Sequence, residues 1–262
     1  MAFRLITLNL NGIRSAAKKG FVEWVQNMRA DCMGVQEIRA QAEDVAGSLD
    51  CVDGMPGHFH FAQKRGYSGV GLYTRKDPSA VIQGFGSKEF DAEGRWVETR
   101  FDTAKRKLSL ISCYFPSGSS SEERQAAKFR FLAKLYPHLM KLKAEREFIL
   151  VGDVNIAHKE IDLRNWKGNQ KNSDFTPDER AWVSKLIGAG GLVDVFRTLN
   201  PRPDQYTWWS NRGQAWANNV GWRIDYHLAT PGIAATAKRE SIFLDQRFSD
   251  HAPLIIDYDF KL

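Results

Sequence analysis

The stretch Phe148-Ile149-Leu150-Val151-Gly152-Asp153-Val154-Asn155 decides the organisation of this chain. Its four consecutive apolar residues predict a buried strand, and Gly152 marks the end of that strand. Asp153 and Asn155 follow at alternate positions, so both side chains point to the same side if the backbone stays extended. The segment alone leaves two interpretations open: two polar groups held over a reacting centre, or a strand that ends in a turn stabilised by Asp and Asn side chains.

Polar residues follow other predicted strands in the same way, which favours the first interpretation. The strand predicted at Phe3 to Leu8 is followed by two asparagines, and the strand predicted at Cys32 to Gln36 is followed by a glutamate. Other strands are expected near Ala80 to Phe85, Trp96 to Phe101 and Leu108 to Cys113. The polar residues at these and later strand ends are Asn9, Asn11, Glu37, Tyr114, Asp153, Asn155, Asp225, Asp250 and His251.

This set of side chains is rich in oxygen, contains one imidazole and lacks a thiol. Carboxylate and amide oxygens suit a hard cation such as Mg²⁺, with Mn²⁺ as a possible substitute, better than they suit Zn²⁺. Such a site supports attack on a phosphate. A single His beside an Asp is more often a structural pair, so the prediction depends on the whole set.

Composition indicates one globular domain over residues 1–262. The chain has 262 residues, 43% of them hydrophobic, with no low-complexity linker or repeat and no apolar run of the roughly 18 residues that a membrane span needs. Its three cysteines form no CxxC pair, which favours a reducing, cytoplasmic location and no membrane association. The first residues lack acids, but a transit peptide there is rejected because its removal would delete Asn9 and Asn11. The net charge of +6 favours a polyanionic partner.

Two helices have clear predicted starts. Ser120 and Glu123 form a potential capping box before a long helix. Thr176-Pro177-Asp178-Glu179 combines an N-cap, a proline at the first helical position and acids in the first turn. The apolar face expected for the first helix comprises Phe129, Leu132, Ala133, Tyr136, Leu139 and Met140. Since predicted strands outnumber helices, we expect mixed sheets packed face to face with helices outside.

Seven short motifs together resemble the exonuclease III family of apurinic/apyrimidinic (AP) endonucleases, in unbroken order from Leu5 to Leu254. They are Leu8 to Arg14, Val35-Gln36-Glu37, Gly66 to Val70, Tyr114-Phe115-Pro116, Gly152 to His158, Gly221 to Tyr226 and Ser249-Asp250-His251. The segment Ile161 to Asn172 resembles the phosphate-contacting loop of the branch that includes the mammalian-type AP endonuclease. The resemblance implies an α/β fold, a four-layered sandwich of two mixed β-sheets flanked by helices.

The resemblance also implies roles for single residues. Glu37 resembles the main Mg²⁺ ligand, with Asn11, Asp250 and Asn9 binding or orienting metal-bound water. Asp153 resembles the residue that deprotonates the attacking water, and Asn155 would donate to a phosphate oxygen. His251, held by Asp225, resembles a phosphate-binding imidazolium, and Tyr114 a phosphate-contacting tyrosine whose phenol could instead support the leaving oxygen.

Double-stranded DNA with abasic sites or damaged 3′ ends is the implied partner of a protein that we expect to be a monomer. Trp208, Trp222 and Ile224 match the apolar pocket that admits a base-free sugar, whereas Trp182 and Trp209 are expected in the core. The residues that resemble DNA-backbone contacts are Arg14, Lys18, Lys19, Arg39, Tyr67, Asn165, Lys167, Asn169 and Asn172. Arg39 replaces the usual Lys of this branch.

Three positions depart from the family pattern. Ser117 replaces a long amide after the Tyr-x-Pro motif, and Arg212 with Gly213 occupies the region that supplies a wedge residue in some relatives. Asp174 stands where these enzymes usually carry Gly, Ser or Ala. If it lies over the lesion pocket, its bulk and charge would oppose incision at an internal abasic site; if it pairs with a neighbour such as Lys171, it would not.

The implied activity is that of a Mg²⁺-dependent DNA-repair nuclease acting at abasic sites and at blocked or recessed 3′ ends, as AP endonuclease, 3′–5′ exonuclease and 3′-phosphatase or phosphodiesterase. One alternative is a 3′-end-processing exonuclease with little AP-site incision because of Asp174. A more distant alternative is a non-catalytic nucleic-acid-binding regulator on the same fold, although such a protein would not need both a metal site and a base.

Overall fold

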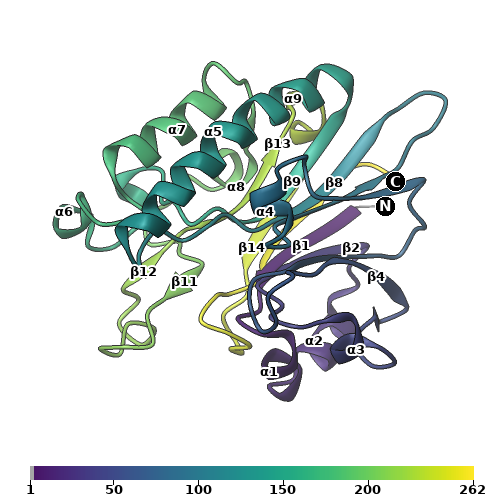
Figure 1. Ribbon diagram of the computed structural model, residues 1–262, viewed down its shortest axis with the longest axis horizontal. Coiled ribbons are helices and arrows are strands. Elements are labelled where there is room, and N and C mark those ends of the chain that lie inside the picture. Colours follow the sequence, from purple (N-terminus) through teal and green to yellow (C-terminus); the bar gives the residue numbers. More distant parts are fainter. Residues whose placement is uncertain (1–2) are drawn as a thin grey trace.

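The computed structural model describes residues 3–262, which form two mixed β-sheets packed face to face between outer helices (Figure 1). One sheet has seven strands in the order β14-β15-β1-β2-β5-β4-β3, and the other has six in the order β10-β13-β9-β8-β7-β6. The first sheet comprises β14 (Ala237–Ile242), β15 (Leu254–Tyr258), β1 (Phe3–Asn9), β2 (Cys32–Gln36), β5 (Val70–Thr74), β4 (Met55–His60) and β3 (Cys51–Val52). The second comprises β10 (Val193–Asp194), β13 (Asp225–Ala229), β9 (Glu147–Asp153), β8 (Leu108–Cys113), β7 (Trp96–Arg100) and β6 (Ala80–Gln83). The expected α/β sandwich is confirmed.

Helices lie on both outer faces (Figure 1). The helices α5 (Glu122–Glu145) and α7 (Pro177–Ile187) cover the six-stranded sheet, and α1 (Ile13–Lys18), α2 (Phe21–Met28) and α3 (Ala42–Val45) lie on the side of the seven-stranded sheet. A small ribbon of β11 (Trp208–Trp209) and β12 (Gly221–Trp222) projects beside them. The remaining helices are α4 (Lys88–Asp91), the 3₁₀ turn Glu160–Asp162, α6 (Trp166–Asn169), α8 (Val195–Leu199) and α9 (Pro231–Ala234). No helix within residues 3–262 has the length and apolar character that crossing a bilayer requires.

Two glycines allow strands to approach closely, Gly34 between the two sheets and Gly152 within the six-stranded sheet. A Cβ on Gly34 of β2 would lie 2.6 Å from a methyl of Val151 in β9, so the absence of a side chain lets the central strands approach. Gly152 has φ 144°, and a Cβ there would lie 2.0 Å from the carbonyl oxygen of Cys113. The strand was expected to end at Gly152, but β9 continues to Asp153, and Gly152 allows it to pass close to β8 just before the site residues.

Helix α5 differs from the prediction in its start and in its buried face. Its N-cap is Ser121, whose hydroxyl accepts from the Arg124 amide, and not Ser120. Phe129 and Ala133 are exposed, contrary to the expected apolar face. The buried side chains are Ala127, Lys128, Phe131, Leu132, Leu135, Leu139 and Leu142. The buried face of α5 is therefore offset by about one residue from the expected apolar face, because it includes the charged residue Lys128.

Candidate active site

The central strands bring the predicted polar residues to one edge of the sandwich. β1 and β2 run parallel and end at Asn9 and Gln36, and β8 and β9 run parallel in the facing sheet. β13 begins at Asp225, opposite Asp153 at the end of β9. β15 pairs antiparallel with β1, so the residues that precede Leu254 lie beside the end of β1. Residues from five distant segments therefore meet at this edge.

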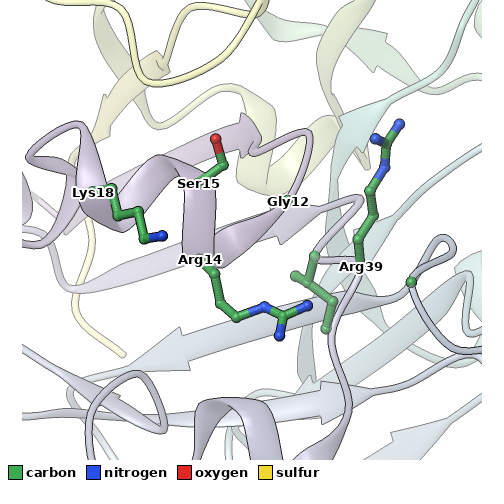
Figure 2. Close-up of a pocket in the computed structure, with 7 residues that line it drawn as sticks. Gly12, Arg14, Ser15, Lys18 and Arg39 are labelled. Carbon is green, nitrogen blue, oxygen red and sulfur yellow. The ribbon is translucent and has the colours of Figure 1, made fainter.

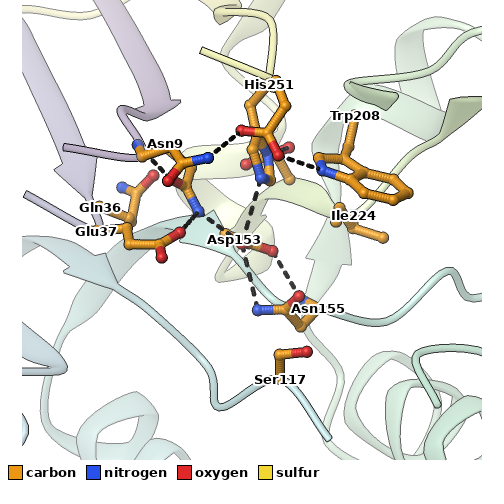
Figure 3. Close-up of polar contacts among 12 residues, drawn as sticks. Asn9, Gln36, Glu37, Ser117, Asp153, Asn155, Trp208, Ile224 and His251 are labelled. Atoms are coloured by element: carbon orange, nitrogen blue, oxygen red, sulfur yellow. Dashed lines mark hydrogen bonds and ion pairs between the residues drawn. The ribbon is translucent and has the colours of Figure 1, made fainter. Parts of the chain in front are cut away.

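Asp153 lies at the centre of this group (Figure 3). Its carboxylate accepts hydrogen bonds from Asn9 Nδ2 at 2.9 Å, from the Asn155 backbone amide at 2.9 Å and from Asn155 Nδ2 at 3.2 Å. Burial raises the pKa of Asp153 to about 8, despite the opposing effect of His251. The carboxyl is thus oriented by three donors, and burial gives its ionised form a higher proton affinity than a carboxylate in water.

His251 is held between two carboxyls. Its Nδ1 lies 2.9 Å from Asp225 Oδ2, and its Nε2 lies 3.8 Å from Asp153 Oδ2. Burial disfavours the imidazolium, but Asp225 and Asp153 outweigh it and raise the pKa of His251 to about 10. The ring is therefore an imidazolium at neutral pH, able to donate through Nε2 toward the space above Asp153.

Two carboxylates and two amides form the predicted metal site. Glu37 Oε2 accepts from Asn9 Nδ2 at 3.1 Å, and Asp250 Oδ1 accepts from Asn11 Nδ2 at 2.8 Å. Within residues 3–262, no cluster of three His, Cys, Asp or Glu residues could hold an ion. The predicted residues Glu37, Asp250 and Asn11 instead offer carboxylate and amide oxygens, the ligand type of a divalent cation that keeps several waters and uses one or two carboxylates. Asn9 orients Glu37 and Asp153 through its amide group, whose oxygen accepts from the Asn11 backbone.

Tyr114 and Tyr67 share a buried arginine that the sequence analysis did not single out. The Arg95 guanidinium lies 4.9 Å from the Tyr114 ring centroid, and its Nη1 donates to the Tyr114 carbonyl at 3.0 Å. Its Nη2 donates to the Tyr67 hydroxyl at 2.9 Å, and Arg124 also donates there. Burial raises the pKa of the Tyr114 phenol well above its usual value, so this group stays protonated as a donor.

Basic residues border two hollows beside α1. The first has a volume of ≈ 420 Å³ and is lined by Arg14, Ser15, Lys18 and Arg39 (Figure 2). Arg39 also pairs with Glu37, and Arg14 pairs with Asp44 at 2.8 Å. The second hollow, of ≈ 380 Å³, contains Lys19 and reaches Asn11 and Asp250.

Arg247 lines the second hollow and was missed in the sequence. Its guanidinium lies 4.5 Å from the Trp216 ring centroid, and no carboxylate of the described chain forms an ion pair with it. The only feature of the sequence that could have identified Arg247 is its position two residues before the Ser249-Asp250-His251 motif. An arginine held on an aromatic ring without a counter-ion is suited to contact an external anion.

The loop that includes α6 is exposed and internally bonded. Asn165 and Lys167 are exposed, and Lys167 Nζ lies 5.6 Å from the Trp166 ring centroid. Asn172 Nδ2 donates to Asn169 Oδ1 at 2.8 Å, and Asn169 Nδ2 donates to the Asn165 carbonyl at 2.8 Å. The three asparagines thus brace one another and present a polar, basic surface.

The predicted apolar pocket residues do come together. Trp208 and Trp222 are paired across β11 and β12, with ring centroids 6.3 Å apart, and pack in one cluster with Ile224. Trp208 Nε1 donates to Asp250 Oδ2 at 3.0 Å, which joins the cluster to the metal-site residues. Phe175, missed in the sequence, also belongs to the cluster. Trp209 is buried as expected.

Asp174 forms an ion pair within the protein. Its Oδ1 accepts from Lys128 Nζ at 2.7 Å, so its charge is compensated inside the protein, by Lys128 and not by Lys171. Burial raises its pKa. Of the two alternatives left open for Asp174, the ion pair agrees with pairing to a neighbour, although the partner is Lys128. Its φ of 75° lies in the left-handed region, which glycine adopts without strain and Asp tolerates better than most residues.

Comparison with protein families gives a match to the endonuclease/exonuclease/phosphatase family over residues 6–251. An exodeoxyribonuclease of Bacillus subtilis (strain 168) is 33% identical over 257 residues, which are 96% of this chain and 97% of the relative. The DNA repair nuclease APEX1 of Danio rerio is 33% identical over 261 residues, 97% of this chain and 81% of the relative.

Solved structures agree with the fold. An AP endonuclease from Archaeoglobus fulgidus superposes with a TM-score of 0.88 at 26% sequence identity, covering 98% of this chain and 100% of that structure. The match extends over both sheets and their helices.

Proposed function

The chain belongs to the endonuclease/exonuclease/phosphatase family, and from this premise we propose that it is a divalent-metal-dependent nuclease that repairs DNA by hydrolysing phosphodiesters at abasic sites and at blocked or recessed 3′ ends. The observation that carries the proposal is the placement of Asp153 between the Asp225–His251 pair and the Glu37 and Asp250 carboxylates.

Each group has a defined task in this reaction. Asp153, fixed by Asn9 and Asn155, accepts the proton of the attacking water. The His251 imidazolium donates to a non-bridging phosphate oxygen, where negative charge develops. The expected donation from Asn155 to phosphate does not fit the structure, because both protons of its Nδ2 are directed to the Asp153 carboxylate and the Phe115 carbonyl, so Asn155 orients Asp153. Tyr114 offers a further protonated donor. A divalent cation, proposed as Mg²⁺ with Mn²⁺ as a substitute, would be held by Glu37, Asp250 and the Asn11 amide, and would neutralise charge on the phosphate and leaving oxygen.

The surroundings of the site support DNA as the substrate. The basic hollows beside α1 and the loop around α6 offer sequence-independent contacts to backbone phosphates. The Trp208–Trp222 cluster offers an apolar wall to a sugar without a base, and flipping such a nucleotide costs least because no base must be unstacked. A phosphatase for a small soluble ester would need neither feature. We further propose that the protein acts as a single catalytic domain, as a monomer in the cytoplasm.

Three labelled duplexes test the function: one with an internal abasic site, one with a recessed 3′ end and one with a 3′-phosphate. Each is incubated with Mg²⁺, Mn²⁺ or EDTA. We expect cleavage of all three with either ion and none in EDTA. Hydrolysis that persists in EDTA, or binding without hydrolysis under every condition, would refute the proposal.

A further inference from the structure

Lys128 of α5 is a fully buried cation outside the set of groups that face the substrate. Its Nζ donates to the Asn155 carbonyl at 2.6 Å and to Asp174 Oδ1 at 2.7 Å, and pairs with Glu179 Oε1 at 2.6 Å. Its side chain has 0% exposure. Burying an ammonium group is costly unless it is paired and hydrogen-bonded, and here all three of its protons have an acceptor.

The partners of Lys128 come from three other segments. Asn155 follows β9, Asp174 lies in the loop before α7, and Glu179 lies in the first turn of α7. Glu179 also accepts from Thr176 and from Gln125 at 3.0 Å, which completes the N-terminal cap of α7. One ammonium group thus joins α5, the end of the central strand, the loop and α7.

Two partners of Lys128 connect it to the proposed reaction centre and to the tryptophan cluster. Asn155 contacts Asp153, and Asp174 directly precedes Phe175. Asn155 has φ 52°, and its Nδ2 donates to Asp153 and to the Phe115 carbonyl. The Asp174 carbonyl accepts from the Ala157 amide at 2.8 Å. The next residue, Phe175, packs against Trp222 with ring centroids 6.4 Å apart. Lys128 therefore links Asn155 to the loop whose buried Phe175 supports Trp222.

We propose that Lys128 is a positioning residue for the hydrolytic reaction, holding Asn155 and the loop that carries Asp174 and the buried Phe175 in one geometry through its bonds to the Asn155 carbonyl and the Asp174 carboxylate. It does not touch the substrate, and the inference rests on the function proposed above. Asp174 and Glu179 are the two counter-ions of this cation, and the fully buried Glu179 still pairs with it when Asp174 is replaced by Asn. A shift of about 1 Å at a group that contacts the reacting atoms costs on the order of 100-fold in rate.

The test must separate positioning from stability, because Lys128→Met alone would leave two buried carboxylates unpaired. The triple variant Lys128→Met/Asp174→Asn/Glu179→Gln removes the whole charge set while keeping side-chain size. Lys134→Met is the matched control, since Lys134 lies on the same helix but is exposed. Its Nζ contacts the Ser87 hydroxyl at 3.3 Å and lies 5.9 Å from the Phe90 ring centroid, with no ion pair to a carboxylate of the described residues. Thermal unfolding, kcat and KM on the abasic duplex, and the NMR signals of the Asn155 side-chain amide are measured.

We expect the triple variant to unfold near the wild-type temperature, with kcat at least about 10-fold lower, KM nearly unchanged and a shifted Asn155 amide signal. The control should match wild type in every measurement. A triple variant with wild-type kcat, or with an unshifted Asn155 signal, would overturn the proposal.

Asp174→Asn keeps Lys128, Glu179 and the bond to the Asn155 carbonyl, and it does not depend on folding of the triple variant. We expect its Asn155 signal and kcat to stay close to wild type. A loss of kcat equal to that of the triple variant would contradict the role of Lys128. The NMR signals need no substrate, so a wild-type protein that cleaves none of the duplexes would refute the nuclease function without deciding the positioning role.

Discussion

Left-handed backbone conformations gather at the site residues. Asn11, Glu37, Asn155 and Asp174 have φ values of 45°, 51°, 52° and 75°. Asn and Asp adopt this region more readily than other residues, but a glutamate there is uncommon and costs about 1–3 kcal/mol. The bonds from Arg39 and Asn9 to the Glu37 carboxylate help to offset that cost. The protein thus holds this carboxylate in its working orientation before any substrate arrives.

Substituting Glu37 or Asp153 tests that orientation at the level of one side chain. Glu37→Gln and Asp153→Asn keep shape but remove, respectively, a ligand charge and the base. We expect each to lower the rate by about 100-fold or more, since a positioned base or metal contributes at least that much. Single-turnover assays measure the rate, and circular dichroism checks the fold. Loss of fold in either variant, or a rate within a few-fold of wild type, would contradict this assignment.

At the scale of secondary-structure elements, strand ends were easier to predict than helix faces. The strand at Cys32–Gln36 and that at Leu108–Cys113 match the structure, because continuous apolar runs ending in polar residues give both their type and their limits. The face of α5 was misjudged because its interior includes Lys128. A charge at an inward position breaks the apolar period, and only the positions of Asp174 and Glu179 explain its burial.

The prediction of site residues from the sequence had the same limit, because contacts between distant segments could not be foreseen. Residues carried by motifs, such as Asp153 and His251, could be identified because Asp153 is the last residue of β9 and His251 lies three residues before β15. Arg95, Arg247 and Phe175 could not, since their roles depend on contacts with the distant residues Tyr114, Trp216 and Trp222. No local pattern encodes a contact between two segments far apart in the chain.

The exposed loop around α6 leads to a prediction about DNA binding. Lys167 is exposed and no carboxylate within residues 3–262 pairs with it, so its contact with DNA would release a counterion. Lys167→Gln should lower the slope of log affinity against log salt by about 1 without changing preference among base sequences. Lys141→Gln serves as the control, because Lys141 is exposed near the C-terminal end of α5. Fluorescence anisotropy at several salt concentrations measures the slopes, and equal slopes in both variants would contradict the contact.

At the scale of the whole molecule, the site depends on the distance between the two sheets. Gly34 allows β2 to approach β9, and the ends of these strands carry Glu37 and Asp153. Gly34→Ala would place a methyl 2.6 Å from Val151, so the sheets must separate slightly. Overpacking of this kind costs about 1–3 kcal/mol. We expect a lower unfolding temperature together with a lower kcat.

The matched substitution for Gly34→Ala is Gly168→Ala. Gly168 lies in α6, where a Cβ would meet no atom within 4 Å. We expect this variant to keep the wild-type unfolding temperature. If Gly34→Ala lost stability but kept full kcat, the spacing of the sheets would not control the site.

His227 makes the stability of the whole sandwich depend on pH. It lies in β13 of one sheet, and its Nδ1 is 3.0 Å from the Tyr258 hydroxyl in β15 of the other. Its Nε2 is buried without a hydrogen-bond partner, and burial lowers the pKa of His227 to about 3. Between pH 6.5 and 3 the unfolded chain therefore binds a proton at this residue that the folded protein does not, so acid favours unfolding.

The free energy of unfolding should consequently fall as the pH drops below 6.5, with His227 contributing up to about 1.4 kcal/mol per pH unit until its folded-state pKa is reached. His227→Phe keeps a planar ring but cannot bind a proton, and it leaves the Tyr258 hydroxyl without its partner. We expect this variant to be less stable than wild type at pH 7.5 and to lose less stability on acidification. Urea unfolding from pH 7.5 to 4.5 measures both slopes. Parallel slopes would mean that His227 takes up a proton in the folded protein and that the two sheets can separate enough to hydrate it.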